Sequence, residues 1–100
     1  MTAMNIVRMR TKPGHEQAYL DLHRNRPLSD MAGLTALRIV KTGANEYVFV
    51  GEWTSMDALA AARPAMIATL DQFRDSLEVL GPDIGVTEPR SGEVVVSRAL

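Results

Sequence analysis

Two histidines and one pair of aspartates are the side chains whose types and spacing bear on metal binding or acid–base catalysis. His15 and His23 are eight residues apart in a predicted helix, which separates them by about 12 Å along its axis. They are too far apart to bind one metal ion as a pair four residues apart does. Asp71 and Asp75 lie on a helix whose apolar residues face the core, so we expect both on the solvated side. The sequence therefore predicts no metal site.

His23 and Arg63 remain as candidates for a polar or catalytic role. His23 follows Tyr19 by four residues and so shares its side of the helix, where it can reach the edge of a cleft. A position at the rim or surface is the alternative to an acid–base role for His23. The sequence does not identify the catalytic residue and leaves these two as candidates.

Trp53 is the only tryptophan and stands at the end of a predicted strand, directly before a helix cap. It either packs in the core or lines a small apolar pocket, since such a pocket can open between the strand ends and the helices. The residues expected to surround a substrate there are Trp53, Tyr47, Phe49, Met66, Leu70 and Phe73.

Several classes of protein are excluded by what the chain lacks. It has no cysteine, no Gly-x-Ser-x-Gly and no Gly-x-Gly-x-x-Gly, which argues against thiolate catalysis and against flavin or nicotinamide in a dinucleotide fold. We expect no cofactor. With 100 residues, 46% of them hydrophobic, and a net charge of −1, the chain suits one domain over residues 1–100 that binds neither nucleic acid nor membrane. No signal peptide is visible, so a cytoplasmic location is expected.

Hydrophobic periodicity and turn residues predict the order β-α-β-β-α-β, in which an antiparallel four-stranded sheet carries two helices on one face. Ser55 is the expected cap of the second helix, and Pro64 the start of a further helical segment with an apolar stripe. The expected elements are strands at 5–11, 34–41, 46–54 and 93–99, a helix at 15–26, and a helical region with the stripe Met66, Leu70, Phe73, Leu77 and Leu80.

Strand 46–54 alternates, with Tyr47, Phe49, Gly51 and Trp53 projecting from one face. The opposite face of the sheet carries the apolar residues Ile6, Val40, Val48 and Val50, together with Arg8 and Arg38. No helix is left to cover that face. We therefore expect a homodimer in which two such faces pack together.

A set of short motifs resembles the antibiotic biosynthesis monooxygenase (ABM) family over about residues 5–80. The motifs are Lys12-Pro13-Gly14-His15-Glu16, Tyr19, Gly33-Leu34, Glu46-Tyr47-Val48, Glu52-Trp53-Thr54-Ser55 and Asp57-Ala58-Leu59. The resemblance implies a ferredoxin-like fold that pairs into a dimeric α+β barrel. It also implies oxygenation of phenolic or anthrone-like substrates without metal, flavin or haem, with electrons from the substrate itself.

The chain departs from the family pattern at two positions. Phe49 stands where family members that tailor polyketides have a substrate-positioning asparagine, and Ala62 stands where many relatives have a histidine. Haem-degrading relatives need a further tryptophan and a helix histidine, which are absent here, so haem oxygenation is not expected. Two functions remain: a cofactor-independent monooxygenase for a small aromatic, quinol-like or anthrone-like compound, or a non-catalytic ligand-binding or accessory protein on the same scaffold.

Overall fold

The structure of the protein is a computed structural model that describes residues 1–100. Its elements in chain order are β1 (Ala3–Arg10), α1 (Glu16–Asn25), β2 (Leu34–Gly43), β3 (Glu46–Trp53), α2 (Met56–Ala61), α3 (Arg63–Phe73), a 3₁₀ turn (Arg74–Ser76) and β4 (Glu88–Glu93). This confirms the predicted order of strands and helices, with the second helical region divided in two.

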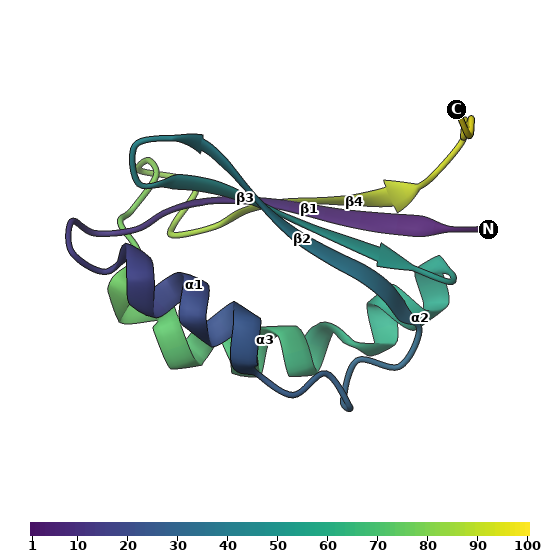
Figure 1. Ribbon diagram of the computed structural model, residues 1–100, viewed down its shortest axis with the longest axis horizontal. Helices are drawn as coiled ribbons and strands as arrows, with labels where there is room; N and C mark the ends of the chain where they lie inside the picture. The colour runs from purple at the N-terminus through teal and green to yellow at the C-terminus, as the bar shows by residue number, and fades with distance from the viewer.

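The four strands form one sheet in the order β2-β3-β1-β4, and every neighbouring pair is antiparallel. All the helices lie against one face of this sheet, and the other face carries none (Figure 1). This is the ferredoxin-like α+β fold expected from the sequence. None of the helices combines the length and the hydropathy that a membrane-spanning helix requires.

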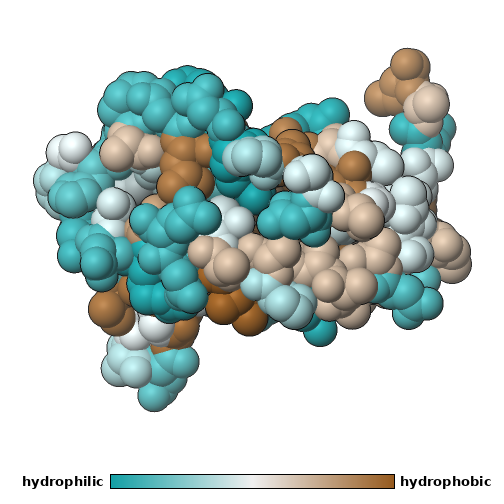
Figure 2. All heavy atoms as spheres, turned by 90° about the horizontal axis from the view of Figure 1, so that it is seen from below, coloured by the Kyte–Doolittle hydropathy of each residue, from teal (hydrophilic) through white to brown (hydrophobic).

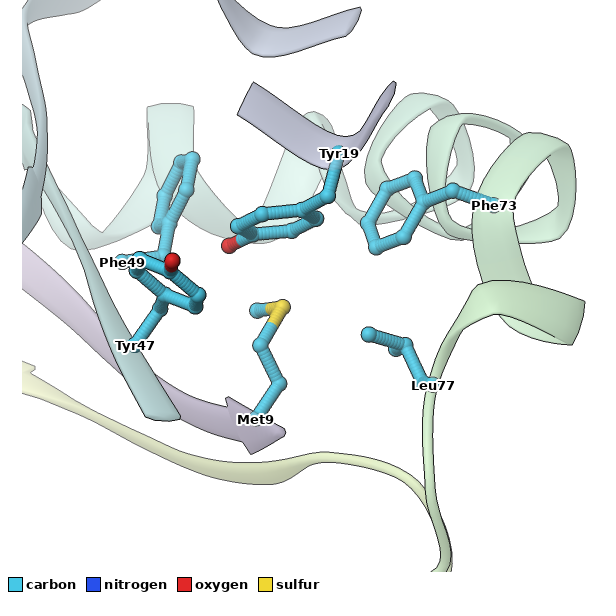
Figure 3. Close-up of a cluster of buried hydrophobic side chains, with 6 residues drawn as sticks. All are labelled: Met9, Tyr19, Tyr47, Phe49, Phe73 and Leu77. Carbon is cyan, nitrogen blue, oxygen red and sulfur yellow. The ribbon is translucent and has the colours of Figure 1, made fainter. Parts of the chain in front are cut away.

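The core lies between the sheet and the helices as two separate clusters. The predicted alternation of β3 is confirmed, because Tyr47, Phe49, Gly51 and Trp53 are all buried and the residues between them are only partly so. The first cluster consists of Met9, Tyr19, Tyr47, Phe49, Phe73 and Leu77, with the Tyr19 ring in its middle (Figure 3). The second consists of Ala3, Met31, Trp53, Leu59 and Ala62.

The division between α2 and α3 follows the local sequence. The Ser55 side chain caps α2 by accepting a hydrogen bond from the backbone N–H of Ala58 at 3.1 Å. Pro64 lies in the first turn of α3, where its missing N–H costs no hydrogen bond. Both features were predicted from the sequence.

The predicted continuation of the second helix to Leu80 is wrong. α3 ends at Phe73, and after the 3₁₀ turn the backbone of Leu77 is extended, with φ −103° and ψ 146°. The segment is held instead by backbone hydrogen bonds to the end of β1, including Glu78 N–H to Arg10 O at 2.8 Å. Periodicity correctly marked Leu77 as a core residue, but pairing with a distant strand decided its conformation.

The predicted last strand at 93–99 is also wrong, because β4 covers Glu88–Glu93. β4 pairs with β1, whose first residue, Ala3, lies opposite Glu93. After the bond from Val94 N–H to Thr2 O at 2.8 Å, β1 offers no further partner. Val95 and Val96 are therefore 84% and 76% exposed despite their high strand propensity.

The two sides of the molecule have different surfaces. On the helix side, hydrophilic residues gather on the left of the view, and a broader area of weakly apolar residues extends over its right half (Figure 2). On the helix-free face of the sheet, Ile6 and Val40 are 45% and 47% exposed. Arg8 lies on the same face and forms ion pairs with Glu46 at 3.3 Å and Glu88 at 2.9 Å. This face has the mixture of apolar and charged residues predicted from the sequence.

Candidate functional site

A cavity of about 260 Å³ lies between the sheet and the helices. Its walls come from β1, β3, β4, α1, α2 and α3, together with Arg26 after α1 and Thr87 before β4. Met9, Phe49 and Phe73 of the first core cluster and Leu59 of the second all contribute to its lining. The cavity thus occupies the space where the two clusters do not meet.

The structure brings most of the predicted site residues to this cavity. Its lining includes Phe49, Met66, Leu70 and Phe73 from the expected substrate-binding set, together with both polar candidates, His23 and Arg63.

Tyr47 and Trp53 lie elsewhere. Tyr47 is 1% exposed within the first cluster and Trp53 is 1% exposed within the second, and neither lines the cavity. Trp53 nevertheless contacts the cavity wall, because it donates a hydrogen bond to Asn5, which lines the cavity.

Asn5 is the most buried polar side chain of the cavity wall, at 4% exposure. Its Oδ1 accepts a hydrogen bond from Trp53 Nε1–H at 2.7 Å. The indole N–H can only donate, so this bond fixes which end of the Asn5 amide faces the tryptophan. The Nδ2 group is directed to the other side, where Met66 Sδ lies 3.8 Å away.

Gly51 makes room for this hydrogen bond. It lies directly opposite Asn5 in the pairing of β1 with β3. A Cβ at this position would overlap Asn5 Oδ1 and would lie 3.0 Å from Trp53 Nε1. The glycine therefore permits the close approach of the two polar side chains beside the cavity.

His23 is enclosed by aromatic rings. Its ring centroid lies 4.8 Å from that of Tyr19, 5.1 Å from Phe73 and 5.7 Å from Phe49. Both ring nitrogens are shielded from solvent and have no hydrogen-bond partner. Burial lowers the pKa of His23 to about 4, and the nearby positive charge of Arg26 acts in the same direction. The imidazole is therefore neutral at pH 7, and its acceptor nitrogen has no partner in the protein.

Arg26 follows α1 and reaches α3. Its Nη1 donates to Thr69 Oγ1 at 3.2 Å, whereas its Nε is shielded and has no partner. Burial lowers the pKa of Arg26, and the charge of Asp30 opposes this shift. No carboxylate lies within ion-pairing distance of Arg26 or of Arg63, which is exposed at the cavity rim.

The chemistry available in the cavity follows from this lining. The walls are largely apolar, two arginines and one neutral histidine face it, and none of its 16 lining residues is acidic. Such a cavity can exclude water from an aromatic ring, hold an oxygen atom through N–H donors and accept a proton at an imidazole. The fold brings together no group of three or more His, Cys, Asp or Glu side chains that could hold a metal ion.

Two cavity residues were missed by reasoning from the sequence. Asn5 occupies an inward position of β1 between Ala3 and Val7, and a polar residue in that buried register was the signal that could have identified it. For Arg26 the sequence predicted only its place as the last residue of the helix at 15–26. Its role depends on Thr69, which is 43 residues away in the chain.

Comparison with known proteins agrees with the fold and the motifs. The family profile for antibiotic biosynthesis monooxygenases matches residues 2–77. No curated protein matches the chain significantly in sequence.

Solved structures share the fold across nearly their whole length. A putative antibiotic biosynthesis monooxygenase from Chloroflexus aurantiacus has a TM-score of 0.72 at 16% identity, covering 99% of this chain and 98% of that one. A protein of unknown function from Nitrosomonas europaea has a TM-score of 0.75 at 20% identity, with 99% and 94% covered. A mutant of SnoaB, a cofactor-independent oxygenase from Streptomyces nogalater, has a TM-score of 0.68 at 14% identity, with 96% and 95% covered. At these identities the solved structures show only that the fold is shared. The family profile is a match of the sequence itself, over residues 2–77. The chain belongs to the antibiotic biosynthesis monooxygenase family.

Proposed function

We propose that this protein is a cofactor-independent monooxygenase that oxidises a small reduced aromatic compound in the cavity between its sheet and helices. The observation that carries the proposal is the apolar cavity itself, at whose wall a buried imidazole has no protein partner for either nitrogen. Membership of the family supports it, as does the fold shared with the cofactor-independent oxygenase SnoaB.

The size of the cavity favours a compact substrate. A dry cavity of roughly 150 Å³ accepts a single benzene ring, and sites for drug-sized ligands begin near 300 Å³. A cavity of about 260 Å³ therefore suits a substituted one-ring or two-ring molecule. Among the expected substrates, a hydroquinone fits this space better than a tricyclic anthrone, part of which would extend out of the cavity.

The proposed reaction needs only the substrate and O₂. A hydroquinone loses a phenolic proton, and the resulting anion reduces O₂. One oxygen atom then replaces a ring hydrogen and the other leaves as water, so that hydroquinone and O₂ give a hydroxyquinone and water. The protein excludes water from the reactive anion and accepts the first proton.

His23 is the proposed proton acceptor, because its neutral imidazole lines the cavity with no competing hydrogen bond. The test is oxygen uptake by metal-stripped, dialysed protein on a panel of hydroquinones and anthrones. His23→Phe is expected to lower kcat on the active substrates by about 10²-fold or more, the usual contribution of a general base.

His15→Ala is the matched control, because His15 precedes the same helix but is exposed and contacts Ser76 instead. Equal activity of the two variants would exclude His23 as the base. Oxygen uptake that appeared only after adding iron or flavin would refute the cofactor-independent mechanism.

Ligand binding without turnover is the second candidate function. The observation in its favour is the pKa of about 4 for His23, which makes its imidazole a weak base at pH 7. This function predicts that reduced aromatics bind, as measured by calorimetry, while oxygen uptake stays at the rate of buffer alone.

We also propose that the working unit is a homodimer formed through the helix-free sheet face. The exposed Ile6 and Val40 on this face support the proposal, because a second copy of the same surface would remove them from water. Light scattering at micromolar concentration tests it, and a strictly monomeric mass would refute it.

A further inference from the structure

The Asn5 amide carries an unused hydrogen-bond donor at the cavity. Its Oδ1 is occupied by Trp53 Nε1–H, which leaves Nδ2 with two N–H groups. Met66 Sδ, at 3.8 Å, is its one partner, and a thioether sulfur is only a weak acceptor. A side chain that is 4% exposed thus holds at least one N–H with no acceptor from the protein. Such groups are costly unless a ligand or water satisfies them.

Arg26 supplies a positive charge to the same cavity without a protein counter-ion. The hydrogen bond to Thr69 holds the guanidinium against α3, and its shielded Nε makes no bond. Asp30 is near enough to affect the pKa of Arg26, but it forms no ion pair with it and does not line the cavity.

The two groups contact neighbouring positions of one helix face. Asn5 contacts Met66, and Arg26 contacts Thr69. Residues three apart in a helix lie side by side, with their Cβ atoms roughly 5–6 Å apart. The amide from β1 and the guanidinium from the end of α1 therefore meet α3 within about one turn of each other.

We propose that Asn5 and Arg26 form a binding site for a negatively charged oxygen, so that the cavity selects aromatic molecules carrying an ionised phenol or a carboxylate. The inference deepens the proposed function, since it takes this cavity as the substrate site. An anion entering a largely apolar cavity loses its hydration, and this cost is offset only by charged or strongly polar partners. An arginine without a counter-ion and an amide with a free donor supply both, as charge-assisted hydrogen bonds.

The selectivity is tested with 4-nitrophenol, because its phenolate absorbs visible light and reports its own ionisation when bound. The other titratable groups lining the cavity are His23, neutral at pH 7, and Arg63 at the rim. The phenolate is expected to bind at least about tenfold more tightly than the protonated phenol, which lowers the pKa of the bound probe by about one unit. The methyl ether 4-nitroanisole, which cannot ionise, should bind no better than the protonated phenol.

Two substitutions test whether Asn5 and Arg26 cause the preference for the phenolate. Asn5→Asp keeps an acceptor for Trp53 but replaces the donor by an oxygen that carries negative charge, and Arg26→Met removes the positive charge while keeping an unbranched side chain. Each should abolish the preference for the phenolate. Arg24→Gln is the matched control, because Arg24 lies on α1 but pairs with Asp21 at the surface, and it should leave the preference unchanged.

Circular dichroism establishes that each variant is folded. Equal binding of phenol and phenolate to the unchanged protein, tighter binding of the neutral form, or no binding of the probe would overturn the proposal. Since binding is measured without turnover, phenolate selectivity without oxygen uptake would refute the oxygenase function alone. Oxygen uptake without selectivity would refute the anion site alone.

Discussion

The hydrogen bond between Trp53 and Asn5 gives a quantitative test of how the cavity wall is held together. Both side chains are buried, at 1% and 4% exposure, and the bond from Nε1 to Oδ1 measures 2.7 Å. Trp53→Phe leaves Oδ1 without a donor, which costs about 1–3 kcal/mol. The smaller ring adds about 1–2 kcal/mol through lost apolar burial. We expect a total loss of about 2–5 kcal/mol from the free energy of unfolding.

Asn5→Leu produces the reverse defect, because it leaves the buried indole N–H of Trp53 without an acceptor. This should lower the free energy of unfolding by about 1–3 kcal/mol. The double variant leaves neither group unpaired. Its loss of stability should therefore be smaller than the sum of the two single losses by at least about 1 kcal/mol.

Urea unfolding at fixed protein concentration, followed by far-ultraviolet circular dichroism, measures these values. Fluorescence is unsuitable because Trp53 is the only tryptophan. A double variant whose loss equals the sum of the single losses within about 0.5 kcal/mol would show that the two side chains do not stabilise each other.

Three further predictions concern other parts of the molecule. Gly51→Ala should lower stability by about 1–3 kcal/mol in urea unfolding, because its Cβ would overlap Asn5 Oδ1. Burial, with the charge of Arg26, lowers the pKa of His23 from 6.5 to about 4, so the unfolded chain binds a proton more readily than the folded chain does. About 3 kcal/mol of stability, fully present above pH ~6.5, should therefore be lost as the pH falls toward ~4. This loss should disappear in His23→Phe, and a His23 pKa near 6.5 by NMR would contradict it. Val40→Glu on the helix-free face should shift the mass in light scattering from dimer to monomer without unfolding the chain, and an unchanged dimer would place the interface elsewhere.

Features that depend on local sequence were predicted correctly. The alternation of β3 places Tyr47, Phe49 and Trp53 inside, since a strand turns successive side chains to opposite faces. Ser55 caps α2 through the backbone N–H of Ala58, and Pro64 opens α3. Each involves residues within a few positions of one another, so propensity and periodicity decide it.

Two local conformations that depend on distant partners were predicted wrongly. The C-terminal valines have strand propensity, yet the last strand forms earlier, over Glu88–Glu93, because Ala3, the first residue of β1, lies opposite Glu93. Leu77 is buried as its spacing indicated, but hydrogen bonds to the end of β1 draw its segment out of the helix.

In the candidate site, too, some features could be predicted from the local sequence and others could not. Its apolar walls at Phe49, Leu70 and Phe73 could be read from periodicity, which marks inward positions without regard to what they meet. Its polar groups could not, because the orientation of Asn5 depends on a tryptophan 48 residues away and that of Arg26 on a threonine 43 residues away. The sequence by itself determined which faces are buried. Only the tertiary structure decided which polar atoms remain unpaired beside the cavity, since a hydrogen bond is made or left open by atoms that folding alone brings within about 3 Å of each other.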